Sequence, residues 1–343
     1  MKRADIVFSG MRPTGRLHIG NYWGALKSWV DLQDRFSCFF CVVDWHMLTT
    51  GYNDTSQLQE NCGEMVLDWL AAGLDPAKCV IFKQSDVPEH AELALMLGML
   101  TPLSWLENNP TWKEQLQELS RPKHSQLAEQ HEIRTYGFMG YPVLQAADIL
   151  LYHGTKVPVG QDQLPHLELS REIVRRFNHA FGDIFAEPQP LLTPTPKVPG
   201  TDARKMSKSY GNAIDIYETA ASLETKVKAM FTDPTRKRAT DPGHPEPCPE
   251  NEPGCSVFAL HKLYASESFV KARGTDCRAG KLGCSACKKD LISEMAGPFE
   301  SFRKRRDSRK TSDVDAVLSQ GAAKARVVAR KTMDEVRAAM RLR

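Results

Sequence analysis

The strongest constraint on the fold is an alternation of short apolar segments with segments of helical periodicity over residues 1–195. Strands that alternate with helices form a mainly parallel sheet whose faces the helices cover. The sequence therefore predicts an α/β domain in this part of the chain. The expected strands are Ile6–Ser9, Cys38–Val43, Cys79–Lys83 and the less apolar Val157–Val159.

The second part of the chain has a different pattern. Residues 186–204 are rich in Pro, Thr and Gly, which is typical of a boundary between domains. From residue 213 onward the periodicity is helical, and it ends in a long basic amphipathic helix expected over Ala316–Leu342. We therefore predict a first domain over residues 1–198, a loop over 199–212 and an all-helical C-terminal domain over 213–343. Residues 240–290, rich in Pro, Cys and Gly, are expected to form an inserted knuckle.

Composition excludes several classes of protein. No apolar run approaches the roughly 20 residues that a membrane helix needs, so no membrane partner is expected. The first eight residues lack the long apolar region of a signal peptide, which favours a cytoplasmic location. In that compartment the nine cysteines do not indicate a disulfide framework.

Charge is unevenly distributed. Residues 301–343 carry 13 Lys or Arg and 5 Asp or Glu, a net charge of +8, whereas the whole chain carries +3. The remainder is therefore at −5, and the basic end suits a polyanion such as RNA. A solvated helix face is an equally good interpretation of the charge alone.

Two short segments, almost two hundred residues apart, both suit the binding of a triphosphate. Pro13–Asn21 places a small-residue turn and an imidazole after an apolar strand, where backbone N–H groups and a helix N-terminus can meet phosphate. Lys205–Ser209 is a Gly- and Pro-flanked loop with two lysines. The expected phosphate donors, which would act in catalysis, are His18, Asn21, Lys205 and Lys208.

The two segments resemble the HIGH and KMSKS signatures of class I aminoacyl-tRNA synthetases, with Asn21 in place of the last consensus histidine. The resemblance implies a Rossmann-like catalytic domain, a helical domain that binds the tRNA anticodon, and ATP with Mg²⁺. It also implies attack of an amino-acid carboxylate on the α-phosphate. The ATP-binding positions that it implies are Arg12, Pro13, Thr14, Gly20, Asn21, Val198, Lys205, Met206, Ser207, Lys208 and Ser209.

A third element, Gly160-Gln161-Asp162-Gln163, resembles the GxDQ element of the tyrosine and tryptophan subclass. The resemblance implies that Gly160, Gln161 and Asp162 contact the nucleotide, with Asp162 on the ribose. Gln163 would contact the polar head of the amino acid.

The segment Tyr141–Tyr152 places Gln145 and Asp148 on one helix face among apolar neighbours. A buried carboxylate would accept the indole N–H of tryptophan and reject phenylalanine, which leaves the acceptor unpaired. The segment resembles the pocket of bacterial tryptophanyl-tRNA synthetases, whose matching Asp reads the indole, so we expect this role for Asp148. Many of these relatives have Met where this chain has Gln145, so either side chain could dominate. Phe8, Tyr141 and His46 are candidate pocket walls or ordinary core residues.

Cys277, Cys284 and Cys287 lie within a compact Gly-rich stretch, and Cys255 or Cys248 offers a fourth thiol. Four thiolates suit tetrahedral zinc or an iron–sulfur cluster, and spacing does not separate the two. The stretch is similar to the [4Fe-4S] motif of some bacterial tryptophanyl-tRNA synthetases, although the first gap is one residue shorter. A set of free thiols is the alternative.

The resemblance implies that L-tryptophan and its tRNA are the substrates and that the chain is a homodimer, with the interface expected in residues 98–136. Tyrosine is the alternative amino acid. A tRNA-binding paralogue without catalysis and a nucleotidylyltransferase are alternatives of other kinds. The intact lysines of the KMSKS-like loop oppose the first, and the pocket residues Asp148 and Gln163 oppose the second.

Overall fold

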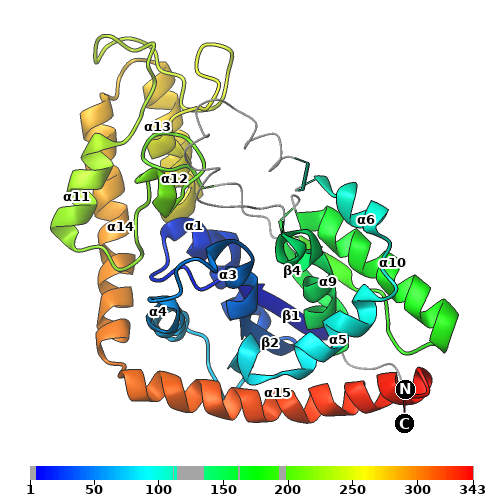
Figure 1. Ribbon diagram of the computed structural model, residues 1–343. Coiled ribbons are helices and arrows are strands. Elements are labelled where there is room, and N and C mark those ends of the chain that lie inside the picture. Colours follow the sequence, from blue (N-terminus) through cyan, green and yellow to red (C-terminus); the bar gives the residue numbers. More distant parts are fainter. Residues whose placement is uncertain (1–4, 111, 114–134, 161–162, 193–197, 343) are drawn as a thin grey trace. The chain divides into compact units, whose positions relative to one another are not determined.

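The computed structural model describes residues 5–110, 112–113, 135–160, 163–192 and 198–342. Contacts between residues divide the chain into two compact units. The first, here called the sheet unit, comprises Met1–Gly15, Ser28–Thr193 and Lys310–Arg343. The second, the helical unit, comprises Arg16–Lys27 and Pro194–Arg309. Figure 1 labels many of the elements of both units, which are described separately below.

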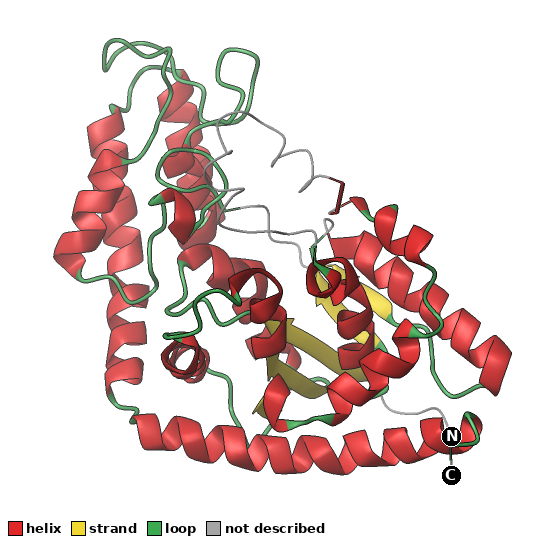
Figure 2. Cartoon of the chain, in the orientation of Figure 1, coloured by secondary structure: helices red, strands yellow, loops and turns green. Residues whose placement is uncertain are grey.

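Within its described residues the sheet unit contains one five-stranded sheet in the order β3-β2-β1-β4-β5, and every neighbouring pair is parallel. The strands, drawn as yellow arrows in Figure 2, are β1 (Ile6–Met11), β2 (Ser37–Val42), β3 (Val80–Lys83), β4 (Lys156–Val159) and β5 (Gln189–Leu192). The α/β prediction is confirmed, and each of the four expected strands is present within two residues of its predicted ends.

The sequence did not predict β5, because its segment contains Pro190 and lies in the stretch that was interpreted as a boundary. Proline lacks a backbone donor and is tolerated mainly in edge strands. As the last strand in the order, β5 lies at one edge of the sheet as far as the structure describes it, where it pairs with β4.

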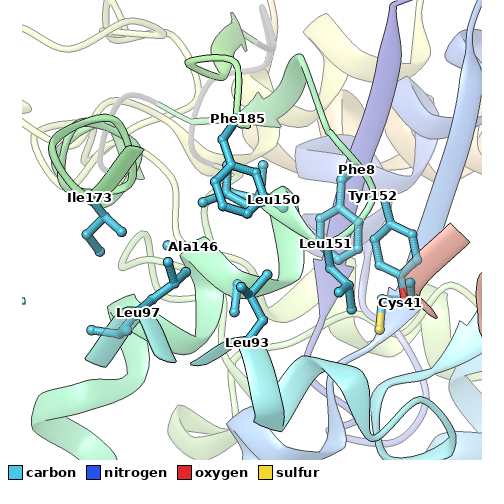
Figure 3. Close-up of a cluster of buried hydrophobic side chains, with 14 of the residues drawn as sticks. Phe8, Cys41, Leu93, Leu97, Ala146, Leu150, Leu151, Tyr152, Ile173 and Phe185 are labelled. Carbon is cyan, nitrogen blue, oxygen red and sulfur yellow. The ribbon is translucent and has the colours of Figure 1, made fainter. Parts of the chain in front are cut away.

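Helices pack on this sheet and bury its apolar side chains. In Figure 3, Leu93 and Leu97 of α5 and Ala146 of α9 belong to the same buried cluster as Phe8. The Phe8 ring of β1 stacks on Tyr152, with centroids 5.5 Å apart. The helices of this unit are α2 (Lys27–Leu32, whose first residue belongs to the helical unit), α3 (Asp44–Gly51), α4 (Leu58–Ala72), α5 (Glu89–Gly98), α6 (Leu103–Glu107), α9 (Tyr136–Leu150), α10 (Leu164–Phe181) and α15 (Thr311–Ala339).

The long basic helix is present as α15, but its contacts differ from the predicted domain organisation. It packs against β3, α4 and α5 and so groups with the sheet unit, not with residues 213–309. Gly321, Ala325 and Ala329 form a buried small-residue face at intervals of four residues. A Cβ on Gly321 would lie 1.7 Å from the carbonyl oxygen of Ile81, so only glycine permits this approach to β3.

The helical unit is built from helices and connecting turns. Within its described residues no strand occurs apart from isolated bridges, in agreement with the expected all-helical character. No described helix of the chain combines the length and apolar character that a bilayer span requires. The elements of this unit are α1 (Ile19–Asn21), the π-helical turn η1 (Tyr22–Leu26), the 3-10 turn η5 (Lys208–Tyr210), α11 (Ala220–Ala229), α12 (Ser256–Tyr264), α13 (Glu267–Arg278) and α14 (Cys284–Asp307).

Candidate active site and cysteine cluster

Backbone pairing joins the histidine segment to the chain that follows the lysine loop. The Ile19 N–H donates to the Ile214 carbonyl at 2.9 Å, and the Ile216 N–H donates to the Leu17 carbonyl at 3.0 Å. His18 and Asp215 form a bridge between these two bonds. All of these residues belong to the helical unit. Two segments that are almost two hundred residues apart are thereby fixed next to one another.

His18 and Asn21 cap the first turn of α1 reciprocally. The Asn21 N–H donates to Nδ1 of His18 at 3.2 Å, and the His18 N–H donates to Oδ1 of Asn21 at 3.1 Å. Because Nδ1 is an acceptor, the proton of the neutral imidazole resides on Nε2. The Asn21 amide likewise uses its oxygen in the cap, which leaves its NH₂ group as a donor. The asparagine in place of the consensus histidine therefore retains a donor at this position.

The structure brings both predicted lysines close to His18. Burial, followed by the positive charges of Lys208 and Lys205, lowers the pKa of His18 to about 4. At neutral pH the imidazole is therefore uncharged, while the two lysine ammonium groups supply positive charge. The result is an N–H donor and two cations in one region, which suits a polyanionic ligand.

The lysine loop is held by Asn212, a residue that the sequence analysis did not identify. Its Oδ1 accepts the Ser207 N–H at 2.8 Å, and its Nδ2 donates to Asp202 at 2.7 Å and to the Lys205 carbonyl at 3.2 Å. Asn212 is buried, so these bonds fix the loop from inside. The Gly211-Asn212 pair was the available sequence signal, because Gly followed by Asn is typical of a turn. In the structure Gly211 ends η5 with a φ of 65°.

The remaining ATP-binding candidates of this unit lie beside the loop. The Met206 N–H donates to the Val198 carbonyl at 3.4 Å, and both side chains are buried. A Cβ on Gly20 would lie 2.8 Å from Nδ1 of His18 and 3.6 Å from Cβ of Met206. Because Gly20 has no side chain, the His18 imidazole can occupy this space. Ser209 lies in η5.

Other candidates belong to the sheet unit. Arg12 donates to Oγ1 of Thr50, and burial lowers the pKa of its guanidinium. Its carbonyl accepts the Thr14 N–H at 3.0 Å, which closes the turn that contains Pro13. The Gln163 N–H donates to the Gly160 carbonyl at 3.0 Å. Gln161 and Asp162 lie outside the described residues.

Asp148 is buried on α9 at the centre of a polar network. His46 lies 2.9 Å from its Oδ2, while Gln84 at 2.7 Å and His90 at 2.6 Å bind its Oδ1. The other nitrogen of His90 lies 2.7 Å from the Tyr152 hydroxyl. The sequence did not predict Gln84, His90 or Tyr152 as members of this network. The polar residues directly after β3 were the available signal, because ligands bind at the carboxyl ends of parallel strands.

These partners keep Asp148 ionised. Burial alone would raise the pKa of its carboxyl, but the His90 charge and the hydrogen bonds from His46 and His90 outweigh it and lower the pKa. A carboxylate offers about four lone-pair sites. Two donors occupy Oδ1 and one occupies Oδ2. Among the described residues His46 is the one donor to Oδ2, so this oxygen retains a lone pair that can accept a further hydrogen bond.

The other candidates for the amino-acid pocket differ in how directly they contact Asp148. His46 contacts Asp148 directly, and its ring meets that of Tyr141 edge-on at 6.3 Å. The Tyr141 hydroxyl lies 2.9 Å from Nε2 of His166. Gln145 is half-buried on α9 and is not one of the donors to Asp148. Phe8 stacks on Tyr152 within the hydrophobic core.

Four cysteines of the helical unit line one cavity. The thiols are those of Cys255, Cys277, Cys284 and Cys287. Burial raises the pKa of Cys255 to about 11 and that of Cys287 to about 12, so these thiols are protonated until a metal displaces the proton. Cys248 does not line this cavity, so the geometry favours Cys255 as the fourth member.

The surroundings of the cavity suit a charged sulfur-bound group. The Arg236 guanidinium lies 3.7 Å from Sγ of Cys284 and 3.9 Å from Sγ of Cys277. A Cβ on Gly243 would lie 2.6 Å from Sγ of Cys277, so this glycine leaves the space next to the sulfur open. The residues present therefore fit a thiolate-ligated metal centre.

Comparisons with known proteins agree over nearly the full chain. Residues 1–300 match the family model of class I tRNA synthetases (W and Y). The chain is 45% identical to the tryptophan–tRNA ligase of Aquifex aeolicus and 48% identical to that of Thermotoga maritima; each alignment covers 98% of this chain and 99% of the relative. The structure of Campylobacter jejuni tryptophanyl-tRNA synthetase, solved with ADP and tryptophan, superposes with a TM-score of 0.80 at 33% identity and covers 98% and 99% of the two chains. The chain therefore belongs to the tryptophan and tyrosine family of class I tRNA synthetases.

Proposed function

We propose that this chain is a tryptophan–tRNA ligase that joins L-tryptophan to its tRNA through a tryptophanyl-adenylate. The observation that carries the reaction is the grouping of the His18 imidazole with Lys205 and Lys208. The amino acid follows from relatives at 45% and 48% identity that are tryptophan–tRNA ligases over their full length. The buried acceptor Asp148 is consistent with that substrate.

In the first step, the tryptophan carboxylate attacks the α-phosphorus of ATP and the bond to pyrophosphate breaks. Negative charge increases on the departing pyrophosphate, so donors placed there stabilise the transition state. We assign this role to Nε2–H of His18, the amide of Asn21 and the ammonium groups of Lys205 and Lys208. Mg²⁺ enters on the triphosphate as part of the substrate and neutralises further charge. In the second step, the tRNA 3′ end attacks the adenylate carbonyl and AMP leaves.

For the choice of amino acid, we assign the indole N–H to the remaining lone pair on Oδ2 of Asp148. His46, Gln84 and His90 hold the carboxylate in place and ionised. A substrate without an N–H at this point leaves a buried acceptor unpaired, which costs about 1–3 kcal/mol. Gln145 retains a second, weaker role at the pocket, and Gln163 binds the amino-acid head group.

The test of the function is ATP–pyrophosphate exchange, run in parallel with tryptophan and tyrosine. Exchange with tryptophan alone is expected. Exchange driven by tyrosine would keep the reaction but overturn the role of Asp148. No exchange with either amino acid, in folded protein that binds ATP, would favour the tRNA-binding paralogue.

Gly20→Ala is expected to slow the exchange rate by about 10- to 100-fold. The new Cβ would occupy space 2.8 Å from Nδ1 of His18, so the imidazole must shift, and misplacing a catalytic group has effects of this size. Gly24→Ala is the matched control, because a Cβ there meets nothing within 4 Å. Equal exchange rates in Gly20→Ala and Gly24→Ala would mean that the position of the His18 imidazole does not affect adenylate formation.

For the tRNA, we propose that residues 213–309 of the helical unit contact the anticodon region. The C-terminal end of α14 carries the exposed Lys304 and Arg305, which provide positive charge for phosphates. Helix α15 was predicted to belong to this domain but groups with the sheet unit, where its exposed basic side chains form a separate candidate surface for RNA.

We further propose a homodimer with the interface near residues 98–136. Residues 111 and 114–134 lie outside the described part of the chain. Large apolar side chains on the described residues that precede and follow this range in the sequence are exposed, which is typical of an interface. The exposed fractions are 58% for Leu95, 73% for Met99, 63% for Leu103 and 81% for Tyr136.

Met99→Glu is expected to weaken the dimer by about 10-fold or more, because a carboxylate would lose hydration at an apolar interface. Sedimentation equilibrium over a range of protein concentrations measures this change. Val327→Glu, at an apolar residue of α15 that is also 73% exposed, should leave association unchanged. A monomeric wild-type protein, or an unaffected Met99→Glu dimer, would reject this interface.

For the cavity of four cysteines, we propose a [4Fe-4S] cluster bound by Cys255, Cys277, Cys284 and Cys287. A single tetrahedral zinc, with Zn–S bonds of about 2.3 Å, requires sulfurs within about 4 Å of each other. Among the described residues, no three of these thiols lie within 4.8 Å of one another, which favours the larger cluster. The cluster would cross-link the segments that carry the four cysteines, and the positive charge of Arg236 would offset the negative charge of the cluster.

Cys284→Ser is expected to abolish the brown visible absorbance and the bound iron while largely preserving ATP–pyrophosphate exchange. The cavity lies away from the lysine loop in sequence and is lined by other residues. Cys248→Ser is the control that should retain the colour. Absorbance that survives in Cys284→Ser, or that disappears in Cys248→Ser, would contradict this ligand set.

A further inference from the structure

A second group of metal-ligating side chains lies outside the cavity of four cysteines. It consists of His244, Cys248 and Glu250, whose potential ligand atoms all lie within 4.8 Å of one another. Among the described residues this is the only such group of three or more. It contains an imidazole, a thiol and a carboxyl, each of which is an established zinc ligand.

A short hairpin fixes the positions of the three side chains. The Cys248 N–H donates to the Asn251 carbonyl at 3.1 Å, and the Asn251 N–H donates back to the Cys248 carbonyl at 3.0 Å. The Asn251 side chain is 2% exposed, and its Nδ2 donates to the His244 carbonyl at 3.1 Å. One buried asparagine therefore ties the turn that carries Cys248 and Glu250 to the backbone of His244.

A buried carboxylate orients the imidazole. Oδ2 of Asp233 accepts from the His244 backbone N–H at 2.6 Å and lies 2.9 Å from Nδ1 of the same residue. Asp233 is only 6% exposed. When Nδ1 carries the proton toward this carboxylate, Nε2 has a free lone pair. Metal-bound histidines are characteristically oriented in this way by a carboxylate on the other nitrogen.

We propose that His244, Cys248 and Glu250 bind one zinc ion, with Asp233 as the residue that orients His244. A thiolate and a carboxylate balance the charge of Zn²⁺, and the neutral imidazole completes three protein ligands. The thiol proton is released to solvent on binding. Glu250 is exposed, so water takes the fourth tetrahedral position.

The zinc ion cross-links a segment that borders the cavity of four cysteines. The Gly243 N–H donates to the Cys277 carbonyl at 3.0 Å, and the Pro245 carbonyl accepts the Cys255 N–H at 3.1 Å. His244 lies between these two contacts. These backbone bonds hold the wall whether or not zinc is bound, so zinc on His244 lies next to the cavity on ligands that do not line it.

The experiment measures zinc and iron per chain in the full-length protein after equilibration with zinc and removal of loosely bound ions on a desalting column. Cys248→Ser is expected to lose about one zinc per chain relative to the wild type, with no loss of iron. Glu250→Gln should weaken zinc binding by about 10-fold or more, and Asp233→Asn by about 10- to 100-fold. Glu252→Gln, an exposed neighbour, is the matched control and should bind like the wild type.

Cobalt provides a second readout that separates the two sites. Co²⁺ added to the wild type should give a sulfur-to-metal absorption band of the intensity of a single thiolate, and Cys248→Ser should lack it. Equal zinc content in Cys248→Ser and wild type would overturn the proposal. Loss of iron together with zinc in that variant would also overturn it, because Cys248 would then be a ligand of the cluster.

Discussion

Lys208→Ala is expected to slow ATP–pyrophosphate exchange by about 10²- to 10³-fold, with little change in the dissociation constant of tryptophan. Removal of one charged donor from a transition state of this kind has effects of that size. Lys208 lies close enough to His18 to lower its pKa, so the two side chains share one electrostatic region. An interaction made mainly in the transition state appears in kcat rather than in substrate affinity.

Lys289→Ala is the control, because it removes the same charge from an exposed site on α14, outside the lysine loop. Stopped-flow measurement of adenylate formation would locate the effect in the chemical step. An unchanged rate in Lys208→Ala would exclude the residue from catalysis. A proportional loss of tryptophan affinity would instead indicate that the loop shapes the amino-acid pocket.

Asp148→Ala is expected to lower both the stability of the sheet unit and the selectivity for tryptophan. The change leaves His46, Gln84 and His90 without their shared acceptor in a buried site. Removing one partner from a buried charged network costs about 3–5 kcal/mol in the free energy of unfolding. The melting temperature and the ratio of kcat/KM for tryptophan over phenylalanine measure the two effects.

Asp148→Asn is the second variant, which serves to measure recognition apart from stability. It preserves the side-chain volume and one acceptor oxygen, but it replaces the other acceptor with an amide donor. Asp183→Ala, an exposed carboxylate of the same unit, should change neither quantity. If a folded Asp148 variant keeps its selectivity for tryptophan, the residue that recognises the indole N–H is Gln145 and not Asp148.

The strands and the phosphate-binding motifs could be predicted because their signals are local. Apolar runs such as Cys38–Val43 specify a buried parallel strand, and the motifs carry distinctive residues at fixed spacing. The edge strand β5 was not predicted, because Pro190 removes the local signal. The amphipathic character of α15 was predicted, but its packing against β3 was not, since that contact joins residues far apart in the sequence.

The residue types of the candidate site could be predicted from the sequence, but the hydrogen-bond partners of those residues could not. Asp148 stood out as a polar residue among apolar neighbours, whereas its donors come from α3, η2 (Gln84–Asp86) and α5. Such contacts depend on how separate elements pack. The pairing of Leu17 and Ile19 with Ile216 and Ile214 is of the same kind. No local pattern indicates it, although it places the two motifs together.

The return of the chain to the sheet unit through α15 has a consequence for synthesis on the ribosome. Residues 194–309 are translated and can fold before α15 emerges, yet β3 lacks its covering helix until then. The nascent sheet therefore exposes the surface that α15 later covers while residues 193–310 are synthesised, and exposed apolar surface of this kind favours aggregation. A chain truncated before residue 311 would lack α15, so its sheet unit would stay incompletely packed and more open to proteolysis.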